Sequence, residues 1–310
     1  MKVFVAGATG VLGRAAVPRL VAAGHRVRGV ARTPEKAAQL SDQGAEPVEV
    51  DLFDPASVRA AVDSCEGVVH MATHIPRLQK GWRKSAWEEN DRLRREGTPI
   101  MVAAALDAGA RVFVKESVCF SYADGGATWL DEDAALAPGL LMQSTLVGED
   151  AALGFADEAA GRRGVVLRFG LFYSHDGVSL DEYLRVAKLG QAPAVGAPEA
   201  YQPSIHVDDA GAAIVAALDA PTGTYNVADE PITKGEWNAA FADAFGLKRK
   251  VRATPKLVMK AGKAMVGPLA ASRRVSSARF RDVTGWAPAY PDATVGLKSV
   301  AAAWKEQHHG

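Results

Sequence analysis

Short apolar runs alternate with longer amphipathic runs through the first half of the chain. The apolar runs contain few polar positions, which is typical of strands that are covered on both faces. They predict strands at residues 2–6, 26–31, 46–50, 67–71, 111–116 and 165–169. The runs between them predict helices over 11–23, 34–43, 56–64 and 99–108. This alternation predicts an α/β protein with a Rossmann-type, doubly wound parallel sheet and right-handed crossovers.

Glycine and proline mark several predicted helix ends. Gly24, Gly44 and Gly109 stand just after three of the predicted helices, where a left-handed residue is favoured. Thr98 followed by Pro99 is typical of a helix start, with the threonine as N-cap and the proline at the first helical position. A helix running through 88–95 is therefore expected to break or kink at this point.

The chain after Phe172 has a different texture, because frequent prolines divide it into short pieces. Strands are predicted at 205–207 and 224–227, and helices at 237–245 and 256–265. We expect a dinucleotide-binding Rossmann domain over residues 1–172 and a smaller, mostly substrate-binding C-terminal lobe over 173–310. Within that lobe, residues 203–230 are expected to return to the sheet.

Charge and composition limit the possible partners. The 310 residues include 36 Lys and Arg and 36 Asp and Glu, so the formal net charge is zero. Nucleic acids and anionic membranes attract a basic excess, so neither is expected as a partner. The sequence contains no stretch of about 18 uncharged apolar residues, so no membrane span is expected. Because a strand is predicted from residue 2, no signal peptide is expected either. We expect a cytoplasmic protein with two reduced thiols, Cys65 and Cys119, and no metal site.

A glycine-rich turn follows the first predicted strand and opens the first predicted helix. Gly7 allows a tight turn, Gly10 lets the backbone approach a pyrophosphate, and Gly13 lets the helix pack on the strand. Free N–H groups at the helix start then receive the anion. The pattern predicts a dinucleotide cofactor bound at Gly7, Thr9, Gly10, Val11 and Leu12.

The ends of the next strands indicate which dinucleotide is bound. NAD sites usually carry a carboxylate after the second strand, but this chain has Arg32 there, which suits the 2′-phosphate of NADP(H). A solvated surface arginine is the alternative, and Arg14 is a candidate second cation. Asp51 and Leu52 are expected beside the adenine. Met71, Ala72 and Thr73 are expected beside the nicotinamide ribose.

These motifs together resemble the extended or atypical short-chain dehydrogenase/reductase superfamily, the epimerase/dehydratase-like group. The resemblance rests on the GATGVLGR turn, the Asp51-Leu52 pair and the His70-Met71-Ala72 strand end. It also rests on later segments, namely LRFGLFY at 167–173, HVDD at 206–209, YNV at 225–227 and GWAP at 285–288. The resemblance covers essentially the whole chain and says little about the substrate.

The resemblance implies acid–base chemistry by a serine, a helix asparagine and a tyrosine followed four residues later by lysine. No tyrosine in this chain has a lysine four residues later. By register, Leu141 or Met142 stands in place of the tyrosine and Thr145 in place of the lysine. Arg94 stands in place of the asparagine, with Asn90 one turn earlier. Ser117 is the best remaining candidate for the serine, although alignment on Tyr122 would place Val118 there.

The cofactor site thus looks intact while the usual proton donor is absent. This combination resembles polyketide-tailoring reductases of the superfamily, which act in antibiotic biosynthesis. It implies an NADPH-dependent ketoreductase of a bulky aromatic polyketide. Proton donors are to be sought among the substrate, water and side chains, with Ser117 and Tyr122 as candidate catalytic residues and His74 and Tyr173 as alternatives.

An insert at 74–87 carries two tryptophans, a proline and five basic residues, and is either a lid or a solvated loop. The predicted substrate residues are His74, Trp82, Trp87, Met142 and Tyr173. Trp129 is a further candidate. Two rival functions remain open: a catalytically silent NADP(H)-binding regulator, and a sugar-nucleotide epimerase or dehydratase. The sequence does not fix the oligomeric state.

Overall fold

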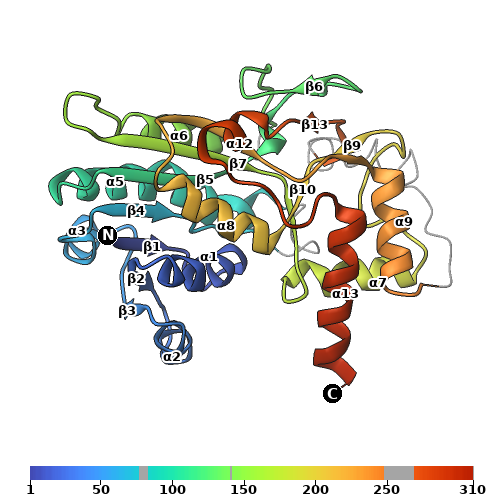
Figure 1. Cartoon of the computed structure of the whole chain (residues 1–310), viewed down its shortest axis with the longest axis horizontal. Coiled ribbons are helices and arrows are strands. Elements are labelled where there is room, and N and C mark those ends of the chain that lie inside the picture. The colour runs from blue at the N-terminus through green and yellow to red at the C-terminus, as the bar shows by residue number, and fades with distance from the viewer. Residues whose placement is uncertain (77–82, 140–141, 248–268, 310) are drawn as a thin grey trace.

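A seven-stranded parallel sheet lies at the centre of the fold, with the order β11-β7-β5-β4-β1-β2-β3 (Figure 1). The computed structural model describes residues 1–76, 83–139, 142–247 and 269–309. The strands of this sheet are β1 (Lys2–Ala6), β2 (Arg26–Val30), β3 (Glu46–Val48), β4 (Gly67–His70), β5 (Val112–Val118), β7 (Arg163–Phe169) and β11 (Gly223–Val227). The predicted doubly wound parallel sheet is confirmed, and its first strands begin and end within about two residues of the predicted limits.

Helices cover both faces of the sheet, and each face has its own apolar core (Figure 1). One face is covered by α1 (Val11–Ala22), α2 (Pro34–Asp42) and α8 (Val207–Ala217). The other is covered by α3 (Pro55–Val62), α5 (Thr98–Asp107) and α6 (Gln143–Leu153). In β1, Val3 and Val5 point into the first core while Phe4 points into the second, which explains the almost continuous apolar run.

The expected turn glycines adopt the conformation that their positions require. Gly24, Gly44 and Gly109 have φ angles of 82°, 80° and 69°, so each ends its helix in the left-handed region.

The predicted break near Thr98 is wrong. Instead, α4 (Glu88–Arg92) continues through a π-helical turn (Leu93–Gly97) directly into α5. Gly97 already has helical angles, and the Thr98 hydroxyl donates to the Leu93 carbonyl at 3.3 Å rather than capping a helix start. In a regular α-helix the Pro99 ring would collide with the preceding turn, and the wider π turn relieves that collision.

The C-terminal lobe has a separate core between α7 (Val178–Lys188), α9 (Lys234–Ala244) and α13 (Ala293–His309). Short strands link it to the sheet: β6 (Trp129–Leu130), β8 (Leu171–Tyr173), β9 (Tyr201–Gln202), β10 (Ser204–His206), β12 (Ile232–Thr233) and β13 (Arg274–Val275). Helix α12 (Ala278–Thr284) packs beside β11. The helix expected at 256–265 lies outside the described residues. Within 203–230, β11 pairs with β7 and α8 packs on the sheet, while the domain limit at 172 stays a prediction.

Candidate active site

The glycine turn leaves space for a ligand at one position only. A Cβ on Gly7, whose φ is +85°, would lie 2.5 Å from the Met71 carbonyl carbon, and one on Gly13 would overlap the Gly7 carbonyl. A Cβ on Gly10 would meet only the Gly7 carbonyl, at 3.3 Å. The first and third glycines are therefore required by internal packing, whereas the outer side of Gly10 is open. Gly10 is the N-cap of α1 without a side-chain cap, so the N–H groups of that turn are available to an anion.

The other predicted cofactor residues lie at the same edge of the sheet. Met71 follows β4 and faces Gly7, and Ala72 and Thr73 continue from it. Asp51 and Leu52 follow β3, where the Asp51 carboxylate accepts from the Phe53 amide. This edge, at the carboxyl ends of parallel strands, is where such sheets bind ligands.

The two arginines considered for the 2′-phosphate, Arg32 and Arg14, differ in their surroundings. Arg32 is exposed after β2 and lies just before α2. Arg14 instead donates from Nε to the Asp176 carboxylate at 2.8 Å and from Nη1 to the Thr9 carbonyl. The Arg14 guanidinium thus joins the glycine turn to the loop after β8, and its assistance to Arg32 stays a prediction.

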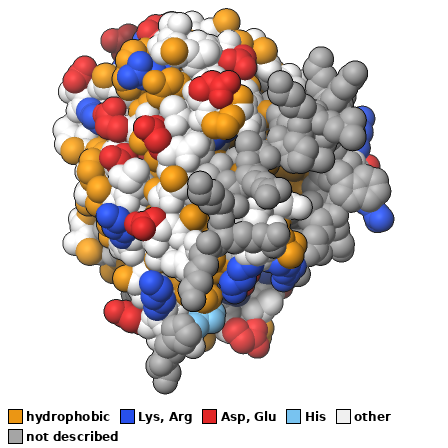
Figure 2. Space-filling model, turned by 90° about the vertical axis from the view of Figure 1, so that its right-hand side faces the viewer, with side chains coloured by type: hydrophobic (Ala, Val, Ile, Leu, Met, Phe, Trp, Pro, Cys, Tyr) orange, Lys and Arg blue, Asp and Glu red, His pale blue; other side chains and the backbone are white. Residues whose placement is uncertain are grey.

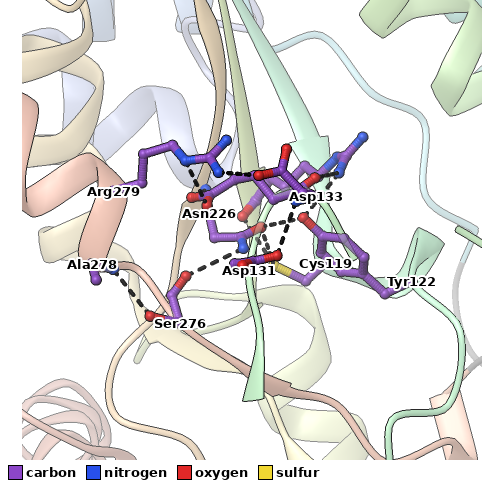
Figure 3. Close-up of polar contacts among 10 residues, drawn as sticks. Cys119, Tyr122, Asp131, Asp133, Asn226, Ser276, Ala278 and Arg279 are labelled. Carbon is purple, nitrogen blue, oxygen red and sulfur yellow. Dashed lines mark hydrogen bonds and ion pairs between the residues drawn. The ribbon is translucent and has the colours of Figure 1, made fainter. Parts of the chain in front are cut away.

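Tyr122 belongs to a buried polar network, so its predicted catalytic role is corrected (Figure 3). Its hydroxyl donates to Asn226 Oδ1 at 2.8 Å and accepts from Arg168 Nη1 at 2.9 Å. Burial raises the pKa of Tyr122, with the nearby Cys119 thiol as the next cause. In Figure 3, Tyr122 and Cys119 contact the Asn226 side chain, and Arg279 and the exposed Asp133 form an ion pair beside them. A phenol held in this way is not positioned to protonate a substrate.

Ser117 is also turned into the interior. It lies on the side of β5 that faces α6, where its hydroxyl donates to the Glu149 carboxylate. Its predicted role in orienting a substrate is corrected for this reason. Val118, the alternative by alignment, is the partly exposed neighbour at the end of β5.

The predicted substrate residues are not all brought together. His74 is exposed and donates its backbone N–H to Asn90 Oδ1, while Trp87 and Met142 are half-buried at the starts of α4 and α6. Tyr173 is buried, and its hydroxyl donates to Asp229 at 2.7 Å, so its placement in a substrate pocket and its candidacy as a proton donor are corrected. Trp82 lies outside the described residues, as do residues 77–81 of the proposed lid. Trp129 is 47% exposed and lies 4.2 Å from the Arg274 guanidinium.

Sequence reasoning missed a buried group of polar side chains around the π turn. Asn90, Arg94, Lys115, Glu116 and Thr145 are all buried where the π turn, α6 and β5 meet. Burial lowers the pKa of Lys115 to about 8, and it also lowers the pKa of Arg94. Two signals were available: the family resemblance draws attention to Asn90, Arg94 and Thr145, and a charged Lys-Glu pair stands inside the apolar strand β5.

Several atoms in this group have no hydrogen-bond partner among the described residues. They are Asn90 Nδ2, Arg94 Nη1, Glu116 Oε2 and Thr145 Oγ1. An unsatisfied buried polar atom costs about 1–3 kcal/mol, and a few per hundred residues is normal across a whole protein. Four such atoms around one turn leave hydrogen-bonding capacity for a polar ligand or ordered water.

Two negative findings concern the described part of the chain. Within it, no helix is both long and apolar enough to cross a bilayer. Nor do its His, Cys, Asp and Glu side chains form a group of three that would hold a metal ion.

Acidic and basic side chains are intermingled on the face drawn in Figure 2, in line with the zero net charge.

Comparison with known proteins supports the cofactor prediction. The model of a family described as NAD(P)H-binding matches residues 7–144. A 3-diazoavenalumate denitrifying reductase of a Streptomyces species is 34% identical over 316 residues, covering 96% of this chain and 99% of that protein. An epimerase family protein of Mycobacterium bovis is 27% identical and covers 78% of each chain. These matches confirm the predicted nicotinamide dinucleotide cofactor.

Solved structures share the fold. The human epimerase family protein SDR39U1 with NADPH has a TM-score of 0.80 at 24% identity, covering 97% of this chain and 99% of that one. A UDP-glucose 4-epimerase of Thermotoga maritima with UDP-glucose has a TM-score of 0.79 at 16% identity, covering both chains fully. At these identities the likeness concerns the fold alone.

Proposed function

Since the chain belongs to the atypical short-chain dehydrogenases/reductases and is an NAD(P)-dependent oxidoreductase, we propose that it reduces a bulky aromatic natural product with NADPH. The bound cofactor supplies a hydride. Arg32 supports NADPH over NADH, because it stands where an NAD site needs a carboxylate. The open side of Gly10 and the free amides of α1 are the places where this chain holds the pyrophosphate.

The first candidate reaction is reduction of an aromatic polyketide carbonyl. The hydride forms a C–H bond at the carbonyl carbon, and the oxygen takes the electron pair and then a proton. The observation that carries the proposal is the absence from the sequence of any tyrosine followed four residues later by lysine. The buried hydrogen bonds of Tyr122 and Tyr173 add support. The proton therefore comes from a neighbouring phenol of the substrate or from water.

A second candidate reaction is favoured by the Streptomyces relative, whose name describes a denitrifying reductase of a diazo compound. Hydride transfer to an arenediazonium ion forms a C–H bond while the C–N bond breaks and N2 leaves. That reaction needs no proton donor, so it suits a site without a side-chain acid. The epimerase hypothesis rests on fold likeness alone, and the silent-regulator hypothesis is not retained for an oxidoreductase.

Deuterium transfer tests the proposal. The protein is incubated with NADPH deuterated at C4 and three matched acceptors: an ortho-hydroxyaryl ketone, its O-methyl ether and an arenediazonium ion on the same ring. We expect enzyme-dependent deuterium in the product of the hydroxy ketone, of the diazonium ion, or of both. If the O-methyl ether is reduced more slowly than the hydroxy ketone, the substrate phenol is the proton donor. If the two ketones are reduced at equal rates, water is the donor. Tight NADPH binding without deuterium transfer to any acceptor contradicts the proposal.

A further inference from the structure

The unpartnered atoms around the π turn come from three elements that pack together. Arg94 lies in the π turn, Glu116 in the second half of β5, and Thr145 in the first turn of α6. Glu116 Oε2 lies 3.7 Å from Lys115 Nζ, and α6 packs against both the π turn and β5. A Cβ on Gly148 would lie 3.4 Å from Lys115 Cε and 3.7 Å from the Arg94 carbonyl, so α6 packs closely on both.

The chemistry of these atoms indicates which kind of ligand they can bind. Arg94 Nη1 is a donor and Glu116 Oε2 is an acceptor whose nearest charged neighbour, Lys115 Nζ, is 3.7 Å away. Thr145 Oγ1 can serve in either role. A ligand that satisfies the group must therefore accept and donate at adjacent atoms. Vicinal hydroxyls do both, because each oxygen accepts one hydrogen bond while its hydrogen is donated.

The location of these three side chains indicates which vicinal hydroxyls they would bind. His70, the last residue of β4, is the register partner of Lys115 in the middle of β5, and Met71 and Ala72 follow β4 directly. This is the edge where the glycine turn meets Met71 and where a parallel sheet binds its dinucleotide. The half of the cofactor that reaches β4 and β5 carries the nicotinamide ribose, whose 2′- and 3′-hydroxyls are vicinal.

We propose that Arg94 and Glu116 form a buried cradle for the diol of the nicotinamide ribose. Arg94 donates to one hydroxyl oxygen and Glu116 accepts from a hydroxyl, with Thr145 beside them. Thr145 stands where the resemblance expects a lysine. In this chain Arg94, in the π turn, therefore supplies the positive charge beside the ribose. The inference rests on the NADPH part of the proposed function and is independent of the substrate.

Binding measurements without substrate test the cradle. Titration calorimetry compares NADPH with 2′-phospho-ADP, which lacks the nicotinamide ribose. Glu116→Gln and Arg94→Met are expected to lower NADPH affinity by roughly tenfold or more, while the affinity for 2′-phospho-ADP changes by less than about twofold. Arg94→Lys keeps the charge and should recover part of the loss. Arg95→Met, at an exposed position of the same turn, is the matched control.

A structural role gives a different result. If Arg94 and Glu116 only maintain the fold, both ligands lose affinity together and the melting temperature falls, which overturns the cradle. Unchanged NADPH affinity in Glu116→Gln also overturns it. If Arg94→Met does not fold, Glu116→Gln and Arg94→Lys carry the test. These binding results do not depend on whether any acceptor of the deuterium experiment is reduced. The ribose cradle and the proposed reductase function can therefore fail independently.

Discussion

The Arg168 guanidinium binds the Glu149 carboxylate through two nitrogens, with Nη2–Oε2 at 2.6 Å and Nε–Oε1 at 3.0 Å, although both side chains are buried. The pair joins β7 to α6 below the carboxyl edge of the sheet. Removing one partner of a buried ion pair leaves an uncompensated charge, which typically costs about 3–5 kcal/mol.

We therefore expect Glu149→Gln or Arg168→Met to lower the free energy of unfolding by about 3–5 kcal/mol. The double variant Glu149→Gln/Arg168→Met should lose less than the sum of the two, because no charge is left alone. Urea denaturation measures all four proteins. Additive losses would show that the two side chains act independently.

The glycine turn separates a folding requirement from a binding requirement. Gly13→Ala places a Cβ against the Gly7 carbonyl, so we expect a loss of at least about 2 kcal/mol of stability. Gly10→Ala meets no such obstacle and should fold within about 1 kcal/mol of wild type, yet bind NADPH poorly. Thermal unfolding and calorimetry distinguish the two. Wild-type NADPH affinity in Gly10→Ala would contradict binding of the pyrophosphate at this turn.

Arg32 is expected to select the phosphorylated cofactor. Arg32→Ala should lower NADPH affinity by roughly tenfold or more, since a charge-assisted fork to a phosphate is lost, and leave NADH affinity nearly unchanged. Binding of both cofactors to the wild type and the variant gives the ratio. An unchanged ratio means that Arg32 is only a solvated surface residue.

Tyr122 and Ser117 are expected to be dispensable for chemistry. Tyr122→Phe should keep turnover within about threefold of wild type, whereas loss of a general acid typically costs about 10²–10⁴-fold. The same variant should lose about 1–3 kcal/mol of stability, because Arg168 Nη1 and Asn226 Oδ1 lose their shared partner. Steady-state kinetics and denaturation are measured together. A collapse of turnover in a stable Tyr122→Phe or Ser117→Ala would restore that side chain as a catalytic residue.

Lys234 should make stability depend on pH. Burial lowers its pKa to about 7, with Arg273 as the next cause, and its ammonium donates to the Leu269 carbonyl at 2.6 Å. Between pH 7 and the usual lysine value of 10.5 the unfolded chain holds more protons than the folded one, so stability rises with pH. The slope contributed by this lysine is up to about 1.4 kcal/mol per pH unit.

We expect Lys234→Met to flatten the stability profile over that pH range, while Lys305→Met, at an exposed position, leaves it unchanged. Denaturation at a series of pH values supplies both profiles. An identical slope in wild type and Lys234→Met would mean that the buried ammonium does not titrate there.

Sequence patterns gave the sheet well because strands buried on both faces have few polar positions, as in β1 and β4. The turn at Gly7 was equally accessible, since strand, glycines and helix are adjacent in the chain. The π turn was missed because Thr98-Pro99 favours a helix start locally, while packing against α6 keeps the helix continuous.

The side-chain partners of the site were beyond reach for another reason. Ser144 donates to Asp91 across 53 positions, and Tyr122 donates to Asn226 across 104. Such pairs follow from how the helices and strands pack, which no local pattern records. A tyrosine near a strand end therefore resembled a catalytic residue in sequence, although the fold turns it inward.

The π turn at Leu93–Gly97 has a genetic consequence. Such a turn is an α-helix carrying one surplus residue, so a single-codon insertion suffices to create it and a single-codon deletion to erase it. Erasing it would rotate Asn90 by about 100° around the helix axis relative to α5 and take its amide out of the interior. A minimal change in gene length thus offered a route to a rebuilt site while every strand of the sheet stayed in place.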